Sequence, residues 1–194
     1  HFTIHSFPTR RSSDLKVAGT NVRVREAGSG APVVILHHDI GTLERLPFYD
    51  AMAAQHRVIL PIHPGWGMNT ERPEWMRSVR DIAAMYRMHL DAQGIEKAHL
   101  IGLGFGGWIA AEMATMAMND TGKLVLVGAM GVQPTEGYIM DMAVYGYLDY
   151  ARAFFHDKDK FREIYGEPDG DMLENFDISR EMCFRTAWKP YMFS

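Results

Sequence analysis

The sequence predicts an α/β fold: a mostly parallel sheet, helices on both of its faces, and a helical segment after the sheet. Three observations support this prediction. Between residues 21 and 127, short strand patterns alternate with stretches of helical periodicity. A glycine-rich turn at residues 102–107 joins one strand directly to a helix. From residue 131 onward, the apolar residues follow helical spacing and no further strand pattern is visible.

The first half of the predicted sheet contains three strands. Residues 21–26 alternate Val22 and Val24 with arginines, which is typical of a half-buried strand. Residues 33–36 form a continuous apolar run, as expected for a strand that is buried on both faces. Residues 47–55 then predict a short helix, and residues 57–60 predict the third strand.

The second half begins with a longer helix. Apolar residues keep helical spacing from Trp75 through Val79 and Tyr86 to Leu90, and Gly94 is a helix stop signal. Residues 99–102 predict a strand, residues 106–118 a helix and residues 123–127 another strand. Because strands and helices alternate, we expect right-handed crossovers and parallel strand pairing.

Residues 131–194 predict an incomplete helical lid that follows a core at residues 16–130. One predicted helix has an apolar face made of Val144, Tyr147, Leu148, Ala151 and Phe155. Several short helices follow, up to Met192. A helical insertion of this kind typically covers a ligand site or packs on a neighbour. We expect the core itself to be truncated at its C-terminal end.

We expect residues 1–15 to be a non-native N-terminal artefact. Residues 5–15, HSFPTRRSSDL, match one reading frame of a common sequencing-library adapter, so we expect natural sequence to begin near Lys16. An Arg- and Ser-rich targeting peptide is the alternative interpretation. The segment lacks the apolar helical periodicity that such a peptide needs.

The composition is that of a globular domain, and it narrows the choice of partners. The 194 residues are 47% hydrophobic and 23% charged, with a formal net charge of −4. No basic stripe is visible, so we expect a small-molecule ligand and no nucleic acid. The apolar runs are too short to span a membrane, and a single cysteine, Cys183, favours a cytoplasmic location. The oligomeric state is left open.

The sharpest motif is Gly102-Leu103-Gly104-Phe105-Gly106-Gly107, placed between a strand and a helix. A dinucleotide-binding turn is one interpretation, but the glycine spacing differs from G-x-G-x-x-G and the turn is not in the first strand–helix unit. The other interpretation is a nucleophile elbow, G-x-S-x-G. Here Gly104 occupies the central position, so the strained backbone turn is kept while the side-chain nucleophile is lost.

Residues 17–155 resemble the α/β-hydrolase superfamily, and most of all its lidded branch of meta-cleavage-product hydrolases and small esterases. The matching pieces occur in the family's order. They are the strand and loop ending in His37-His38-Asp39-Ile40-Gly41, the loop at residues 63–67, the elbow with the helix phrase at residues 106–112, and the strand at residues 124–127.

The resemblance implies an oxyanion hole formed by the backbone N–H groups of Asp39 and Phe105, with His37, His38 and Met130 lining the pocket. Three residues depart from the family pattern. Gly104 replaces the nucleophile, His38 stands where a glycine is usual, and Ile62 stands where an Asp is frequent. The family's catalytic acid and histidine come from later strands that this sequence does not contain.

A metal site is an alternative use of His37, His38, Asp39 and His63. Successive strand residues point to opposite faces, which is poor geometry for chelation by both His37 and His38. We therefore expect no metal and no cofactor, with His37 as a hydrogen-bonded loop anchor. Trp66 and Trp108 are interpreted as packing residues, and Cys183 as a buried structural thiol.

Two functions are consistent with these residues. The full-length protein is expected to act on a small carbonyl compound, by ester or C–C bond hydrolysis, without the usual Ser nucleophile. A non-catalytic binding or partner protein is the alternative. Enzymatic status stays open, and the 194-residue fragment itself is expected to be inactive.

Overall fold

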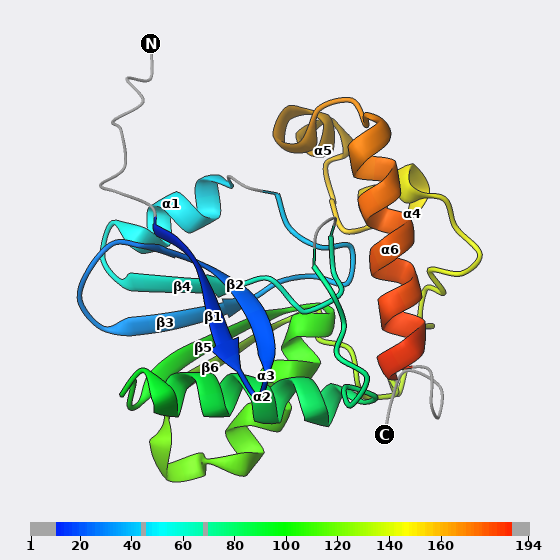
Figure 1. Ribbon diagram of the computed structural model, residues 1–194. Helices are drawn as coiled ribbons and strands as arrows, with labels where there is room; N and C mark the ends of the chain where they lie inside the picture. Colours follow the sequence, from blue (N-terminus) through cyan, green and yellow to red (C-terminus); the bar gives the residue numbers. More distant parts are fainter. Residues whose placement is uncertain (1–10, 44–45, 68–69, 188–194) are drawn as a thin grey trace.

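The computed structural model describes residues 11–43, 46–67 and 70–187. Within these ranges the chain forms an α/β fold followed by a helical segment (Figure 1). The strands are β1 (Arg11–Val17), β2 (Thr20–Ala27), β3 (Pro32–Leu36), β4 (Arg57–Pro61), β5 (Ala98–Leu103) and β6 (Thr121–Val127). The helices are α1 (Pro47–Ala53), α2 (Val79–Ala92), α3 (Phe105–Met116), α4 (Tyr147–Ala153), α5 (Lys158–Tyr165) and α6 (Gly170–Ala187), with a 3-10 turn at Met118–Asp120.

The strands form one mostly parallel sheet in the order β1-β2-β4-β3-β5-β6. Strand β3 pairs in parallel with β4 and β5, and β5 pairs in parallel with β6. Strands β1 and β2 are antiparallel to their neighbours. The predicted α/β class and mostly parallel sheet are confirmed. Because β3 and β5 are parallel neighbours, their carboxyl ends lie side by side.

Strand β1 was not predicted. It pairs with β2 through a tight hairpin in which Ala18 and Gly19 both have positive φ, the backbone that a two-residue turn between twisted strands requires. Residues 11–15 of the predicted artefact thus lie in this strand, while residues 1–10 lie outside the described residues. The foreign origin of residues 5–15 stays a prediction.

Helices cover both faces of the sheet, as predicted. On one face, α1 packs Tyr49 and Ala53 against Val33, Ile35 and other apolar residues of the strands. On the other face, α2 and α3 form a larger core that continues into the lid helices (Figure 1). Burial of these apolar faces is the main force that fixes the helices on the sheet.

Helix α2 begins later than its apolar periodicity predicted. Ser78 is its N-cap: the Ser78 side chain accepts from the N–H of Asp81, and the Asp81 side chain accepts from the N–H of Ser78. This capping box stabilises the start of the helix at Val79. Trp75 lies before the helix and its side chain is 41% exposed, so its inclusion in the helical face was wrong.

The helical segment predicted as a lid contains α4, α5 and the long helix α6, which stand beside one side of the core (Figure 1); the name lid is kept here for these three helices. The predicted apolar face of the first lid helix was only partly correct. Helix α4 begins at Tyr147, after Gly146, and it buries Tyr147, Tyr150 and Ala151. Val144 lies outside the helix and Leu148 is 40% exposed. The final lid residues, 188–194, lie outside the described residues.

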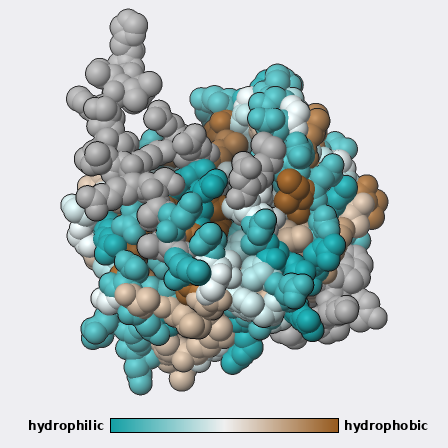
Figure 2. Space-filling model, in the orientation of Figure 1, coloured by the Kyte–Doolittle hydropathy of each residue, from teal (hydrophilic) through white to brown (hydrophobic). Residues whose placement is uncertain are grey.

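The surface view is mainly hydrophilic, with apolar residues in separate patches (Figure 2). At the end of the sheet, Leu124, Val125, Leu126 and Val127 of β6 are each between 40% and 49% exposed. Among the described residues, none of the helices combines the length and the apolar character needed to cross a lipid bilayer.

Candidate functional site

The predicted elbow is present between β5 and α3. Strand β5 ends at Leu103, Gly104 turns the chain with φ 52° and ψ −116°, and α3 begins at Phe105. The N–H of Gly104 donates to the carbonyl of Val127 at 3.0 Å, and the N–H of Met130 donates to the carbonyl of Gly104 at 3.0 Å. The apex is therefore fixed by β6 and the loop after it.

The two flanking glycines are required by close backbone approach. A Cβ on Gly102 would lie 2.5 Å from the Cα of Gly107, and a Cβ on Gly106 would overlap the carbonyl of Leu36. The N–H of Gly106 instead donates to the carbonyl of His37 at 3.1 Å. The elbow is thus packed directly against the loop that follows β3.

The space above Gly104 is filled by the next two residues of that loop. A Cβ on Gly104 would lie 2.5 Å from Nδ1 of His38 and 2.6 Å from Oδ1 of Asp39. Glycine suits this position for two reasons: it adopts the positive φ without strain, and any Cβ here would displace the side chains of His38 and Asp39. The side chains of His38 and Asp39 thus occupy the space in which the nucleophile side chain of a G-x-S-x-G elbow would lie.

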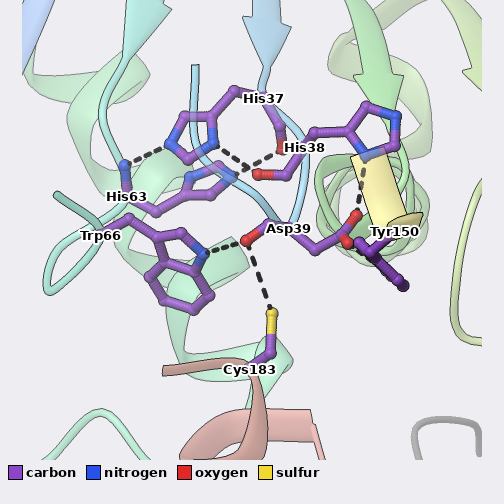
Figure 3. Close-up of polar contacts among 7 residues, drawn as sticks. All are labelled: His37, His38, Asp39, His63, Trp66, Tyr150 and Cys183. Carbon is purple, nitrogen blue, oxygen red and sulfur yellow. Dashed lines mark hydrogen bonds and ion pairs between the residues drawn. The ribbon is translucent and has the colours of Figure 1, made fainter. Parts of the chain in front are cut away.

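His38 and Asp39 form a hydrogen-bonded pair. Nδ1 of His38 lies 2.7 Å from Oδ1 of Asp39, and Oη of Tyr150 in the lid donates to Oδ2 of Asp39 at 2.7 Å (Figure 3). The Asp39 side chain is 1% exposed. Burial alone would raise its pKa, but the hydrogen bonds from His38 and Tyr150 and the charge of His38 hold the pKa of Asp39 below its usual value. The carboxylate therefore stays ionised near neutral pH.

The main chain of Asp39 links the same loop to two further elements. Its carbonyl accepts from Nε1 of Trp66 at 3.1 Å, and Sγ of Cys183 in α6 lies 4.0 Å from the same oxygen (Figure 3). Burial raises the pKa of the Cys183 thiol well above its usual value, so this thiol is a protonated, structural group. Asp39 thus joins the elbow to a core loop, to α4 and to α6.

His37 and His63 form a buried, neutral support beneath the loop. Their rings stack with centroids 3.7 Å apart, and Nε2 of His37 accepts from the N–H of His63 at 3.0 Å. Nδ1 of His37 therefore carries the proton that is donated to the carbonyl of His38 at 2.8 Å. Burial lowers the pKa of His37 to about 4 and that of His63 well below its usual value. Neither ring is a base that gains a proton near pH 7.

The structure places the sequence-predicted site residues close together, around the elbow. Phe105 is the first residue of α3, so its N–H has no acceptor within the helix, and its buried ring stacks on Trp66 at 5.0 Å. Asp39, the other predicted oxyanion donor, lies in the loop whose side chains stand above Gly104. Met130 lies beside the apex through its bond to Gly104.

His37 and His38 diverge as their adjacent positions predicted. The His38 ring packs at 4.5 Å from Phe154, far from the His63 ring that His37 contacts. Within residues 11–43, 46–67 and 70–187, no group of three or more His, Cys, Asp or Glu side chains is arranged to hold a metal ion.

Tyr150 is the site residue that the sequence did not indicate. Its spacing from Tyr147 places it on the buried face of α4, but its partner Asp39 is 111 positions away in the chain. Only the folded structure reveals that the lid contributes a hydrogen-bond donor to Asp39, in the loop that packs on the elbow.

A cavity of about 260 Å³ lies beside residues 37–43, the loop after β3 that packs on the elbow and is called the elbow loop here. Its walls come from β2, from the loops after β3 and β4, and from the lid. His37 and Trp66 line it, whereas Gly104 is not one of the described residues that do. Of the three residues predicted to line the pocket, His37 lines this cavity, whereas His38 and Met130 are not among the described residues that do.

Comparison with known proteins identifies the family. The model of the alpha/beta hydrolase fold family matches residues 32–164. The 2-hydroxymuconate semialdehyde hydrolase of Pseudomonas sp. (strain CF600) is 34% identical over 142 residues, which cover 69% of this chain and 48% of that protein. A 2-hydroxy-6-oxononadienedioate/2-hydroxy-6-oxononatrienedioate hydrolase of Paraburkholderia phymatum is 35% identical over 143 residues, which cover 66% of this chain and 49% of that protein.

Solved structures agree on the fold. A meta-cleavage product hydrolase from Pseudomonas fluorescens IP01 superposes with a TM-score of 0.66 at 22% identity, over 97% of this chain and 73% of that one. The chain spans about half the length of the two curated relatives described above. Elbow, sheet order and family match together show that this chain belongs to the α/β-hydrolase fold family.

Proposed function

We propose that the full-length protein acts on a small carbonyl compound, by ester or C–C bond hydrolysis, with water as the attacking group. The observation that carries this proposal is the His38–Asp39 pair above Gly104. A side-chain nucleophile is absent from the apex, so no acyl-enzyme can form there. A histidine held by an ionised carboxylate is instead the arrangement that a general base needs.

The reaction follows from the orientation of this pair. Because Nδ1 of His38 faces the Asp39 carboxylate, Nε2 is the nitrogen that accepts a proton from water. The water oxygen then bonds to the substrate carbonyl carbon, and the N–H of Phe105 stabilises the oxyanion. Collapse of this intermediate breaks the C–O or C–C bond, and protonated His38 returns the proton to the leaving group.

The relatives named above support a carbonyl substrate, because their names describe hydrolases of a semialdehyde and of oxo-dienedioates. The test uses the full-length protein with two substrates, p-nitrophenyl acetate and a 2-hydroxy-6-oxo-dienoate, followed by chromatography. His38→Asn should lower the rate of hydrolysis by about 100-fold or more. His156→Asn, an exposed lid histidine, is the matched control and should keep the rate. Equal rates in the two variants would overturn the role of His38.

One observation favours the second candidate, a non-catalytic binding protein. The side chains of His38 and Asp39 occupy the volume in which a substrate carbonyl would meet an elbow nucleophile. In a binding protein, side chains in this volume would not impair function, because no reaction takes place at the apex. Binding of the dienoate by the full-length protein with no conversion over prolonged incubation would select this candidate and reject the hydrolase.

A further inference from the structure

The cavity beside the elbow loop has one polar wall built from arginines. Arg23 and Arg25 are two positions apart on β2, so they project from the same side of the strand, while Val22 and Val24 are fully buried on the other side. Arg25 also donates to the carbonyl of Leu43 at 3.3 Å, which holds its guanidinium at the cavity. Two guanidinium groups therefore lie at one wall of the cavity, and the carboxylate of Asp14 lies 3.6 Å from the guanidinium of Arg23.

The lining of the cavity also includes a buried hydroxyl, that of Ser179. Ser179 of α6 is fully buried, and its Oγ has no hydrogen-bond partner within the described residues. Buried polar groups are almost always hydrogen-bonded, and an exception calls for an explanation. Because Ser179 lines the cavity, a bound ligand that accepts a hydrogen bond provides one.

The remaining walls combine polar residues, among them Thr42, Thr70 and Asn175, with a set of apolar and aromatic ones. The apolar and aromatic residues are Ile40, Ile62, Trp66, Tyr147, Tyr165 and Met172. The volume of about 260 Å³ lies just below the range of pockets that hold drug-sized molecules. The cavity therefore suits a compact ligand with an apolar body and one charged end.

We propose that this cavity is a second ligand site, separate from the elbow apex, that binds a small organic anion. The anionic group lies between Arg23 and Arg25, Ser179 donates its hydroxyl to the ligand, and the apolar body packs against the lid. The site does not depend on turnover at the elbow. Bidentate guanidinium contacts serve carboxylates and phosphates equally, so the probes below separate these two anions.

The test measures binding of three probes that share a phenyl ring: benzoate, phenyl phosphate and the neutral benzyl alcohol. Calorimetry should detect benzoate or phenyl phosphate, and the tighter of the two identifies the preferred anion. Arg23→Gln should weaken binding by about tenfold, the loss expected for a charge-assisted hydrogen bond. Arg80→Gln removes the same charge from an exposed ion pair with Glu112 outside the cavity and should leave binding unchanged. Equal weakening by both variants would overturn the site.

Two further variants separate ligand binding from stability. Asp14→Asn removes the carboxylate that lies 3.6 Å from Arg23, so it should preserve or tighten anion binding. Ser179→Ala should raise the melting temperature without ligand, because it removes an unpaired buried hydroxyl, and should weaken binding by about fivefold. An unchanged dissociation constant in Ser179→Ala would contradict its role.

Methionine methyl resonances locate the bound anion. Met172 lines the cavity, whereas Met130 is held beside Gly104 at the elbow. Benzoate should shift the Met172 methyl signal and leave that of Met130 in place. The reverse pattern, or binding of benzyl alcohol as tight as that of benzoate, would overturn the proposal. Unchanged hydrolysis in His38→Asn, with benzoate binding intact, would contradict the proposed catalytic function and leave this site standing.

Discussion

Tyr150 in lid helix α4 donates a hydrogen bond of 2.7 Å to the buried carboxylate of Asp39, in the loop that packs on the elbow. Burial and the negative charge of Asp39 raise the pKa of Tyr150, so the phenol stays protonated and remains a donor across the physiological pH range. This contact makes the lid part of the site's structure, since Asp39 also holds His38 above Gly104.

Tyr150→Phe should destabilise the chain by about 1.5–3 kcal/mol, because a buried carboxylate loses a hydrogen bond. Urea denaturation measures the free energy of unfolding, and amide hydrogen exchange should show the largest loss of protection in α4. Tyr138→Phe is the control, since Tyr138 is 82% exposed. If both variants unfold at the same urea concentration, the hydrogen bond from Tyr150 to Asp39 does not stabilise the chain.

Gly104→Ala should destabilise the chain by about 2–5 kcal/mol, the sum of a positive-φ penalty and overlap with His38 and Asp39. Gly128→Ala separates the two terms. Gly128 has φ 53°, close to the 52° of Gly104, but a Cβ there meets nothing within 4 Å. Its cost should be about 1–2 kcal/mol. Equal costs for the two variants would show that the apex has room for a side chain.

The same overlap bears on restoring a nucleophile. Gly104→Ser alone should react poorly with a serine-directed phosphonate, because its Cβ would meet the side chains of His38 and Asp39. Gly104→Ser combined with His38→Gly removes one of the two obstructions and should react faster, as followed by intact-protein mass. Faster labelling of the single variant would contradict the packing described here.

The buried histidines predict a loss of stability in mild acid. His37 has a pKa of about 4 in the folded chain against an ordinary value of 6.5, so the unfolded chain binds a proton first as the pH falls. Its contribution is complete above pH 6.5 and declines by about 3 kcal/mol as the pH approaches 4. Thermal unfolding across this range should show a shallower decline in His37→Asn than in the unaltered chain.

His156→Asn is the control for that experiment, because His156 is an exposed lid residue. It should leave the pH dependence of the melting temperature unchanged. His63, whose pKa is also lowered by burial, adds to the decline in the same direction, so His37→Asn reduces the slope without abolishing it. A slope unaffected by His37→Asn would show that this ring is not buried in its neutral form.

Local signals explain how much of the fold was predictable. The period-two alternation of Val22 and Val24, the apolar run of β3 and the glycines around Gly104 each act within a few residues, and the structure confirms the elements they predicted. Strand β1 was missed because its polar residues carry no such pattern and its pairing depends on the hairpin at Ala18 and Gly19.

Contacts between distant segments were beyond sequence reasoning. Sequence reasoning gave the chemistry of Gly104 but not the identity of the groups above it, because His38 and Asp39 reach the apex only through the packing of β3 against β5. The Tyr150–Asp39 bond spans 111 positions. The cavity wall likewise joins β2 to α6, through Arg23 and Ser179, which no shared pattern connects.

The most direct test of the proposed water-based mechanism is the intact mass of the full-length protein, quenched with acid while it is hydrolysing p-nitrophenyl acetate. With Gly104 at the apex, we expect an unmodified mass at every time point while nitrophenol accumulates. A protein heavier by one acetyl group, appearing and decaying at the rate of turnover, would contradict it.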